Sequence, residues 1–162
     1  MDLKRTAIGA VAGAAATVPM TAWMLGGQAL TRHGELAPKR LVRRSARRAG
    51  LRARRGGPGT ALATTAAHLG FGAACGALYG AVVLRSSPAR GAGFGIGVWA
   101  ASYTGWIPAL GLLPPPHRDH PGRALTMLTA HLIYGAGLGA ATAAYDRSPA
   151  AGHAHGGDFS SP

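Results

Sequence analysis

The chain has 162 residues, enough for one domain, and carries 17 basic residues against only 5 acidic ones, a formal net charge of +12. Four long segments nevertheless contain no Asp, Glu, Lys or Arg: residues 7–30, 61–84, 91–117 and 124–145. Each exceeds the roughly 18 uncharged residues that indicate a transmembrane helix, since about 20 residues at 1.5 Å each cross the hydrocarbon core. This distribution disfavours a soluble basic domain, and we predict an all-α, four-helix transmembrane bundle within residues 1–146.

The first predicted span, 7–30, follows a charged start and begins like a secretory signal peptide. Its apolar character continues through Trp23, Met24 and Leu25 to Leu30, about twice the length of the apolar region of a signal peptide. We therefore expect a helix that stays in the membrane rather than a leader that is removed.

The loop 31–60 holds ten of the 17 basic residues. Within 39–55 small apolar residues recur at helical spacing, which predicts a short amphipathic helix on the membrane surface. The arginines expected to contact anionic lipid head groups are Arg43, Arg44, Arg47 and Arg48. Two alternatives stay open: a solvated loop that only sets topology, which is the favoured interpretation, and a nucleic-acid-binding arm. The second is disfavoured, because no aromatic residue for base stacking is interleaved with the arginines.

The third predicted span, 91–113, ends near Pro108 and the proline run 114–116, where missing amide donors stop a helix. Aromatic residues suited to a membrane interface lie towards that end: Trp99, Tyr103 and Trp106. After the fourth span, 124–145, the tail 147–162 has no apolar periodicity. We predict that this tail is disordered.

The second and fourth spans, 61–84 and 124–145, resemble each other in a constant register that aligns His68 with His131. A His-Leu pair shared at the same phase as two glycines is the most specific part of this match. The matched positions are Leu62, Ala67, His68, Leu69, Gly72, Ala73, Gly76 and Ala77, against Leu125, Ala130, His131, Leu132, Gly135, Ala136, Gly139 and Ala140. We infer a duplicated helical hairpin, although the first and third spans show no convincing match.

Glycines recur at every fourth position along each predicted span. A stripe without side chains lets two helix backbones approach closely, which is how helices associate in lipid. The predicted packing residues are Gly72, Gly76 and Gly80 on the second span and Gly135 and Gly139 on the fourth, with Gly9, Gly13, Gly91 and Gly95 on the other two. These stripes indicate a compact bundle.

His68 and His131 each lie at the eighth residue of a span, and they have two interpretations. Each is a neutral core imidazole hydrogen-bonded to a Thr, a Tyr or a carbonyl, with Thr64 one turn before His68. Alternatively they form a polar pair that handles a proton, because ionisable residues at membrane depth are costly and are functional candidates. Such a pair would resist double protonation. Cys75, the single cysteine, is interpreted as a small core residue.

Motifs of enzymes, metals and cofactors are absent from the sequence. The stretch GAGFGIG at 91–97 lacks the third glycine of a dinucleotide-binding fingerprint, and there is no GxSxG. No span contains Asp, Glu or a second Cys to join the histidines around zinc, which wants four ligands. We therefore expect no enzymatic activity, no metal and no cofactor.

The basic residues also predict topology. With both termini outside, 12 basic residues, including those of the loop 31–60, face inward and 5 face outward. Lys4 and Arg5 favour the opposite orientation. On the count, we place the loop 31–60 on the cytoplasmic face.

Several short motifs give the chain a resemblance to the YagU-like small bacterial inner-membrane proteins. The motifs are His68 followed by Phe71 and Tyr79, LGLLPP at 110–115, AHLIYG at 130–135, and APKR at 37–40. The resemblance covers roughly residues 7–145 and implies a multi-span protein of the bacterial inner membrane. It implies no catalytic residues, because no activity is established for that family.

The leading functional hypothesis is a non-enzymatic membrane protein of the bacterial envelope, with a structural, stress-related or small-permeation role. The alternative is a proton- or solute-conducting channel or transporter that uses His68 and His131. The expected partners are the lipid bilayer, anionic head groups and a second copy of the chain, and not nucleic acid.

Overall fold

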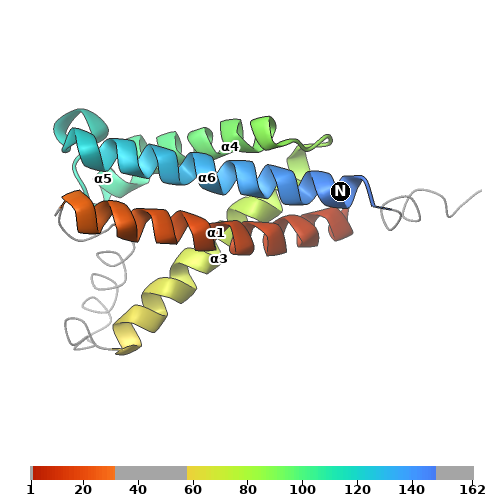
Figure 1. Ribbon diagram of the computed structural model, residues 1–162, viewed down its shortest axis with the longest axis horizontal. Helices are drawn as coiled ribbons and strands as arrows, with labels where there is room; N and C mark the ends of the chain where they lie inside the picture. Colours follow the sequence, from red (N-terminus) through yellow and green to blue (C-terminus); the bar gives the residue numbers. More distant parts are fainter. Residues whose placement is uncertain (1, 32–57, 149–162) are drawn as a thin grey trace, which may run out of the picture.

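The computed structural model describes residues 2–31 and 58–148, and these ranges consist of helices and short connecting turns (Figure 1). No β-strand occurs within them, which confirms the predicted all-α fold class. The elements are α1 (Leu3–Thr31), α3 (Pro58–Val82), α4 (Pro88–Ala100), the π-helix η1 (Ala101–Trp106), α5 (Ile107–Ala109), the 3-10 helix η2 (Pro116–Arg118) and α6 (Pro121–Asp146). The predicted interfacial helix, with Arg43, Arg44, Arg47 and Arg48, and residues 149–162 of the predicted disordered tail lie outside the described residues.

Three helices of the described chain are long and apolar enough to cross a membrane, and they correspond to three of the four predicted spans. Their apolar stretches are Leu3–Gly27, Ala61–Val82 and Pro121–Asp146. Helix α6 begins upstream of the predicted start at 124, because His120 and Pro121 form a regular helix N-terminus. The His120 imidazole accepts a hydrogen bond from the Gly122 amide at 3.2 Å, and Pro121 occupies the first turn, where no amide donor is needed.

The predicted third span, 91–113, is not one continuous helix. Helix α4 has 13 residues, which cover about 20 Å, whereas the hydrocarbon core is about 30 Å thick. The backbone then widens into η1, departs from helical angles at Gly105 (φ −103°, ψ −105°), and continues as the short α5. Pro108 explains the break, since a proline cannot donate to the carbonyl four residues earlier and its ring would clash there. The irregular turn just upstream of the proline absorbs that conflict.

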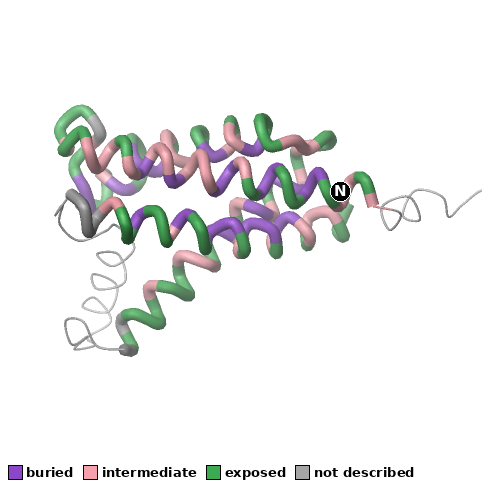
Figure 2. The backbone as a smooth tube through the Cα atoms, in the orientation of Figure 1, coloured by how far each residue is buried: buried purple, intermediate pink, exposed green. Residues whose placement is uncertain are grey.

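The helices pack as two antiparallel pairs. Helix α3 packs against α1, α4 packs against α6, and α1 and α6 lie side by side between them (Figure 1). Helix α3 crosses α1 obliquely, so its first half extends away from the other helices and is mostly exposed, whereas the buried residues of α3 lie in its second half, at the crossing (Figure 2). The N-terminal end of α1 and the C-terminal end of α6 meet at one end of the bundle.

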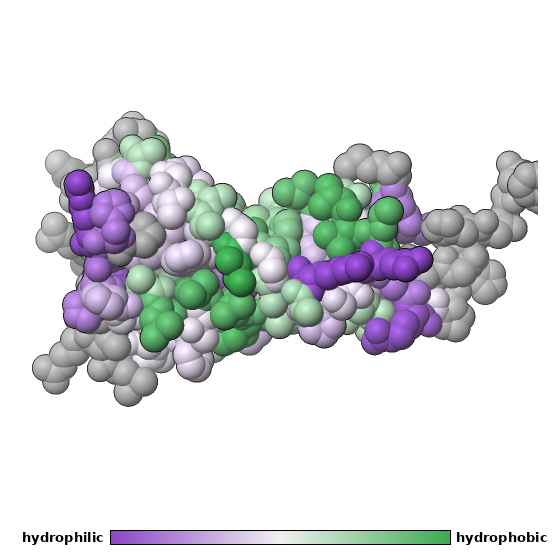
Figure 3. All heavy atoms as spheres, turned by 90° about the horizontal axis from the view of Figure 1, so that it is seen from above, coloured by the Kyte–Doolittle hydropathy of each residue, from purple (hydrophilic) through white to green (hydrophobic). Residues whose placement is uncertain are grey.

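Large apolar side chains cover the outside of the bundle. Val11, Leu78 and Leu125 are 69%, 55% and 65% exposed, and they come from three different helices. Strongly hydrophilic residues gather towards the two ends of the long axis, while the region between them is apolar or weakly polar (Figure 3). Such a surface suits contact with lipid, because soluble proteins rarely expose large contiguous apolar patches.

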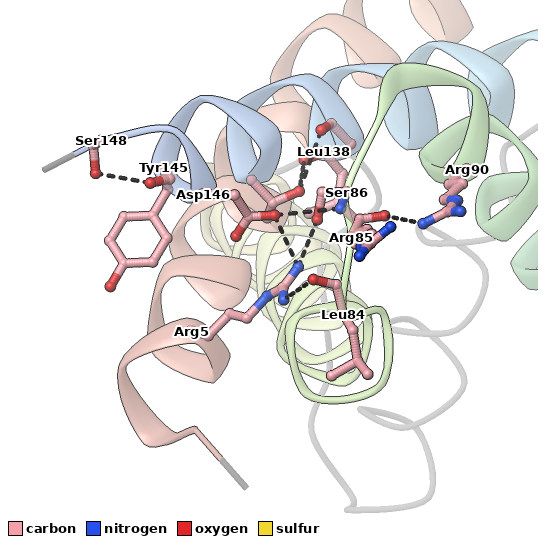
Figure 4. A network of polar contacts seen from close by, with 11 residues as sticks. Arg5, Leu84, Arg85, Ser86, Arg90, Leu138, Tyr145, Asp146 and Ser148 are labelled. Atoms are coloured by element: carbon pink, nitrogen blue, oxygen red, sulfur yellow. Dashed lines mark hydrogen bonds and ion pairs between the residues drawn. The ribbon is translucent and has the colours of Figure 1, made fainter. Parts of the chain in front are cut away.

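Two ion-pair clusters mark the ends of this apolar region. At one end, Arg5 pairs with Asp146 at 3.0 Å and also donates to the Leu84 carbonyl and the Ser86 hydroxyl, at 2.6 and 2.8 Å (Figure 4). These bonds tie the start of α1 and the end of α6 to the turn between α3 and α4.

At the other end, Arg123 pairs with Asp119 at 3.4 Å, and Asp119 also accepts a hydrogen bond from the Tyr103 hydroxyl. Along α6, the helix from Arg123 to Asp146 covers about 34 Å at 1.5 Å per residue, close to the thickness of a hydrocarbon core. The charges therefore lie where the head groups of a bilayer would lie.

Candidate functional site

Glycines bring α1 and α3 into backbone contact. A Cβ on Gly76 would lie 2.8 Å from the Cα of Gly13 and 3.0 Å from its amide nitrogen. A Cβ on Gly80 would lie 3.3 Å from the Cα of Gly9 and closer still to the backbone of Arg5. Side chains at these positions would force the helices apart, so this close approach requires glycine.

The pair α4 and α6 repeats this contact. A Cβ on Gly139 would lie 2.9 Å from the Cα of Gly91 and 3.0 Å from its amide nitrogen, and one on Gly135 would lie 3.0 Å from the Cα of Gly95. Gly139 therefore meets Gly91 as Gly76 meets Gly13. Gly76 and Gly139 match in the same register as the two histidines, whereas Gly13 and Gly91 match only in a different one. The sequence alone did not reveal the register that aligns Gly13 with Gly91, because few other residues of the first and third spans match in it.

His68 and His131 line one cavity of about 110 Å³, the central cavity, which lies between α1, α3, α4 and α6. His68 lies on α3 and His131 on α6, and both helices run antiparallel to α1 and hence parallel to each other. The walls of the cavity also include residues of α1, α4 and η1. The structure thus brings together two histidines that lie far apart in the sequence, on the second and the fourth predicted spans. A cavity of this size accommodates several water molecules or a small solute.

The hydrogen bonds of His68 define its tautomer. Its Nδ1 lies 3.1 Å from the hydroxyl oxygen of Thr21, and that hydroxyl donates its single hydrogen to the Thr17 carbonyl at 2.7 Å. With the Thr21 hydroxyl assigned as donor to Thr17, Thr21 accepts from His68 and the ring hydrogen is assigned to Nδ1. In the neutral ring this leaves a lone pair on Nε2.

His131 has the same tautomer for a different reason. Its Nδ1 lies 2.8 Å from the Met127 carbonyl oxygen, which can only accept, so Nδ1 of His131 donates. Both neutral rings therefore keep the Nε2 lone pair out of these bonds. A lone pair on each ring is what a proton, a hydrogen-bond donor or a soft cation would bind.

Several lining residues were not singled out by sequence reasoning. Tyr134, 2% exposed, donates its hydroxyl hydrogen to the Gly72 carbonyl at 2.7 Å and so connects α6 to α3 beside the histidines. Three methionines also line the cavity: Met20, Met24 and Met127. Cys75, interpreted from the sequence as a small core residue, lines it too. The spacing of four between Met127 and His131, and between Met20 and Met24, is the signal in the sequence that places each pair on one helix face.

A second opening reaches His68 from the side. Where the first half of α3 diverges from α1, a groove of about 510 Å³ lies between the two helices. Its walls include Thr21 and Leu25 on α1, and Thr64 and His68 on α3. His68 thus borders both the lateral groove and the central cavity.

The described residues contain no group of three or more His, Cys, Asp or Glu side chains placed to hold a metal ion. The polar and sulfur groups that line the central cavity are imidazoles, hydroxyls, thioethers and one thiol, and the remaining lining residues are apolar or glycine. No carboxylate is among the residues that line the central cavity.

The described residues form an all-helical fold in which three helices are long and apolar enough to cross a membrane. No protein-family model, curated protein or solved structure matches the chain. The resemblance to the YagU-like proteins therefore stays a prediction from the sequence.

Proposed function

We propose that the chain is a multi-span protein of the bacterial plasma membrane, without enzymatic activity, that admits a proton or a small solute to its central cavity. The observation that carries this proposal is the shared cavity of His68 and His131. Among the structural, stress-related and small-permeation roles expected from the sequence, permeation is the one that uses this cavity.

The lipid-facing surface supports placement in a membrane. Three helices have sufficient length and apolarity, and the two ion-pair clusters are separated by about 34 Å along α6. We propose that α4, η1 and α5 together form the remaining span, the third in chain order, because the described chain returns through them from the Ser86 turn to the Asp119 end. The matched glycine contacts of the two pairs favour an ancestral duplication of a helical hairpin.

The second candidate is a channel or transporter in which the two histidines themselves conduct a proton or a solute. It is favoured by the position of His68 between the lateral groove and the central cavity. Along α6, His131 lies about 12 Å from Arg123 and about 22 Å from Asp146, at 1.5 Å per residue. The cavity is therefore nearer the Arg123 end. Ionisable residues at such depth are costly to bury, which favours a function for the pair.

Flux through proteoliposomes tests both forms of the proposal. Purified protein is reconstituted into vesicles that contain a pH-sensitive dye or a small neutral solute. Release of protons, reported by the dye, or of the solute is followed from pH 5 to 8. We expect faster release than from protein-free vesicles, and a decrease in the His68→Leu and His131→Leu variants. His117→Leu is the matched control, because His117 lies exposed in η2, away from the cavity. Release equal to that from protein-free vesicles would contradict a permeation role.

A further inference from the structure

Three of the four methionines of the chain line the same cavity as the two histidines. Met20 and Met24 come from α1 and Met127 comes from α6, and they are 6%, 2% and 5% exposed. Methionine often fills irregular gaps in a core, because its side chain is flexible and polarisable. Here, however, a cavity of about 110 Å³ remains beside all three side chains, so they have not closed the space they line.

The donor atoms around this cavity are soft and neutral. They are the thioether sulfurs of the three methionines and the Nε2 lone pairs of His68 and His131. Thioether and thiol sulfur select monovalent copper over harder cations, and imidazole also binds copper well. These residues come from α1, α3 and α6 and line the same cavity.

The same surroundings disfavour divalent and hard cations. Zinc prefers four His, Cys or carboxylate ligands, and no group of three such side chains is placed together among the described residues. Magnesium and calcium require oxygen ligands, and no carboxylate lines the cavity. The cost of moving an ion from water into a medium of low dielectric is also smallest for a single charge.

We propose that the central cavity binds a soft monovalent metal ion, Cu(I), through methionine sulfur and the Nε2 atoms of His68 and His131. This inference rests on the proposed permeation function, since it names the class of solute that the cavity admits. Thr21 and the Met127 carbonyl hold the two rings with Nε2 unprotonated, which is the form that binds a metal. The methionines supply selectivity.

Silver(I) titration of the full-length protein in detergent tests the site, because Ag(I) shares the soft, monovalent character of Cu(I) and does not change oxidation state. The methionine methyl groups are labelled with ¹³C and observed by NMR. We expect the signals of Met20, Met24 and Met127 to shift at one equivalent of Ag(I). Met1 is the internal control and is expected to shift little. An unchanged spectrum of the three cavity methionines overturns the proposal.

Variants test the same ligands through affinity. Methionine to leucine is a conservative change of volume, so Met20→Leu, Met24→Leu and Met127→Leu should fold while losing sulfur. We expect the triple variant to lose more Ag(I) affinity than the roughly 10–100-fold that removal of an outer-shell partner costs. His153→Gln with His155→Gln is the control and should retain the affinity. Affinity lost only in that control would assign binding to the tail and overturn the proposal.

The result of the Ag(I) binding experiments can be distinguished from the result of the flux experiment. Ag(I) binding is measured in detergent without any gradient, so it does not depend on permeation. Flux without Ag(I) binding retains the permeation role and overturns the metal assignment. Ag(I) binding at the cavity methionines without flux supports the site and overturns the permeation role.

Discussion

At the scale of the residue, the hydrogen-bond partners of the two histidines decide what the cavity can bind. His68 donates from Nδ1 to the Thr21 hydroxyl, and His131 donates from Nδ1 to the Met127 carbonyl. The first partner lies on a neighbouring helix and the second on the same helix, one turn earlier. Both bonds nevertheless have the same effect, because they leave Nε2 as the acceptor on each ring.

The Thr21 contact predicts an effect on stability at this scale. Thr21→Val keeps the shape of the side chain and removes the acceptor of the His68 N–H, so we expect a loss of about 1–3 kcal/mol in the free energy of unfolding. Thr104→Val is the matched control. Thr104 also donates to the carbonyl four residues earlier, Ala100, but it is exposed, so its loss should stay within about 0.5 kcal/mol. Thermal unfolding in detergent gives both values, and equal losses would contradict a role of Thr21 in holding the ring.

The sequence located the histidines but not their surroundings. The repeated His-Leu placed His68 and His131 at matching positions of their spans, since a helical repeat preserves depth. It did not identify Thr21, Tyr134 or the methionines as their neighbours. Those contacts depend on how α1 and α6 rotate about their axes, which is decided by packing and not by the spacing within one helix.

At the scale of the element, glycine stripes determine the distance between helices. Gly76 meets Gly13, and Gly139 meets Gly91, at nearly the same Cβ distances of 2.8 and 2.9 Å to the opposite Cα. Since the neighbouring atoms are backbone, a larger residue cannot be accommodated by rotation of a side chain. The two helix pairs therefore require glycine at the same place in the contact.

Alanine substitutions test this requirement. Gly76→Ala and Gly139→Ala should each lower the free energy of unfolding by about 1–3 kcal/mol, because the added methyl overlaps the opposite backbone. Gly70→Ala is the control on α3, since nothing lies within 4 Å of its Cβ position, and Gly137→Ala is the control on α6, where the nearest atom is 3.6 Å away. The controls should be neutral or should stabilise by up to about 1 kcal/mol. Comparable losses in test and control variants would mean that the helices do not pack through the stripes.

The helix that begins as α4 loses its α-helical geometry before the proline that interrupts it. Pro108 and the proline run after it predicted the end of the third span. The backbone already departs from α-helical geometry at η1, upstream of Pro108, and Gly105 takes the non-helical angles. Sequence reasoning placed the break at the proline itself. The deviation lies earlier because the clash of a proline ring is with the preceding turn, and a glycine in that turn accommodates it most easily.

At the scale of the whole molecule, charge and chain direction predict orientation. Arg5 and Asp146 meet at one end of the bundle, while the end of α1 and the start of α6 lie together at the other, where Gly27 faces Thr126. The loop 31–60 therefore connects to the same end as Asp119 and Arg123. The excess of basic residues on that side predicts that it faces the cytoplasm.

Cysteine labelling in whole cells tests this orientation. In a Cys75→Ser background, Ser45→Cys should be protected from a membrane-impermeant maleimide until the cells are permeabilised, because we place the loop inside. Ser148→Cys, one residue past the C-terminal cap of α6, is the matched control and should react in intact cells. The reverse pattern would place the termini in the cytoplasm and contradict the prediction.

The sequence by itself determined the all-helical class, the positions of the three regular apolar helices, the glycine stripes and the repeat of His68 at His131. These features follow from local rules of charge, length and spacing along a single helix. Only the tertiary structure decided that α4 stops short, that the two glycine pairs make the same contact, and that both histidines border one cavity with Met20, Met24 and Met127. The physical reason is that these features are relations between helices, set by backbone contact at glycine, and no spacing within one helix encodes the rotation of its neighbour.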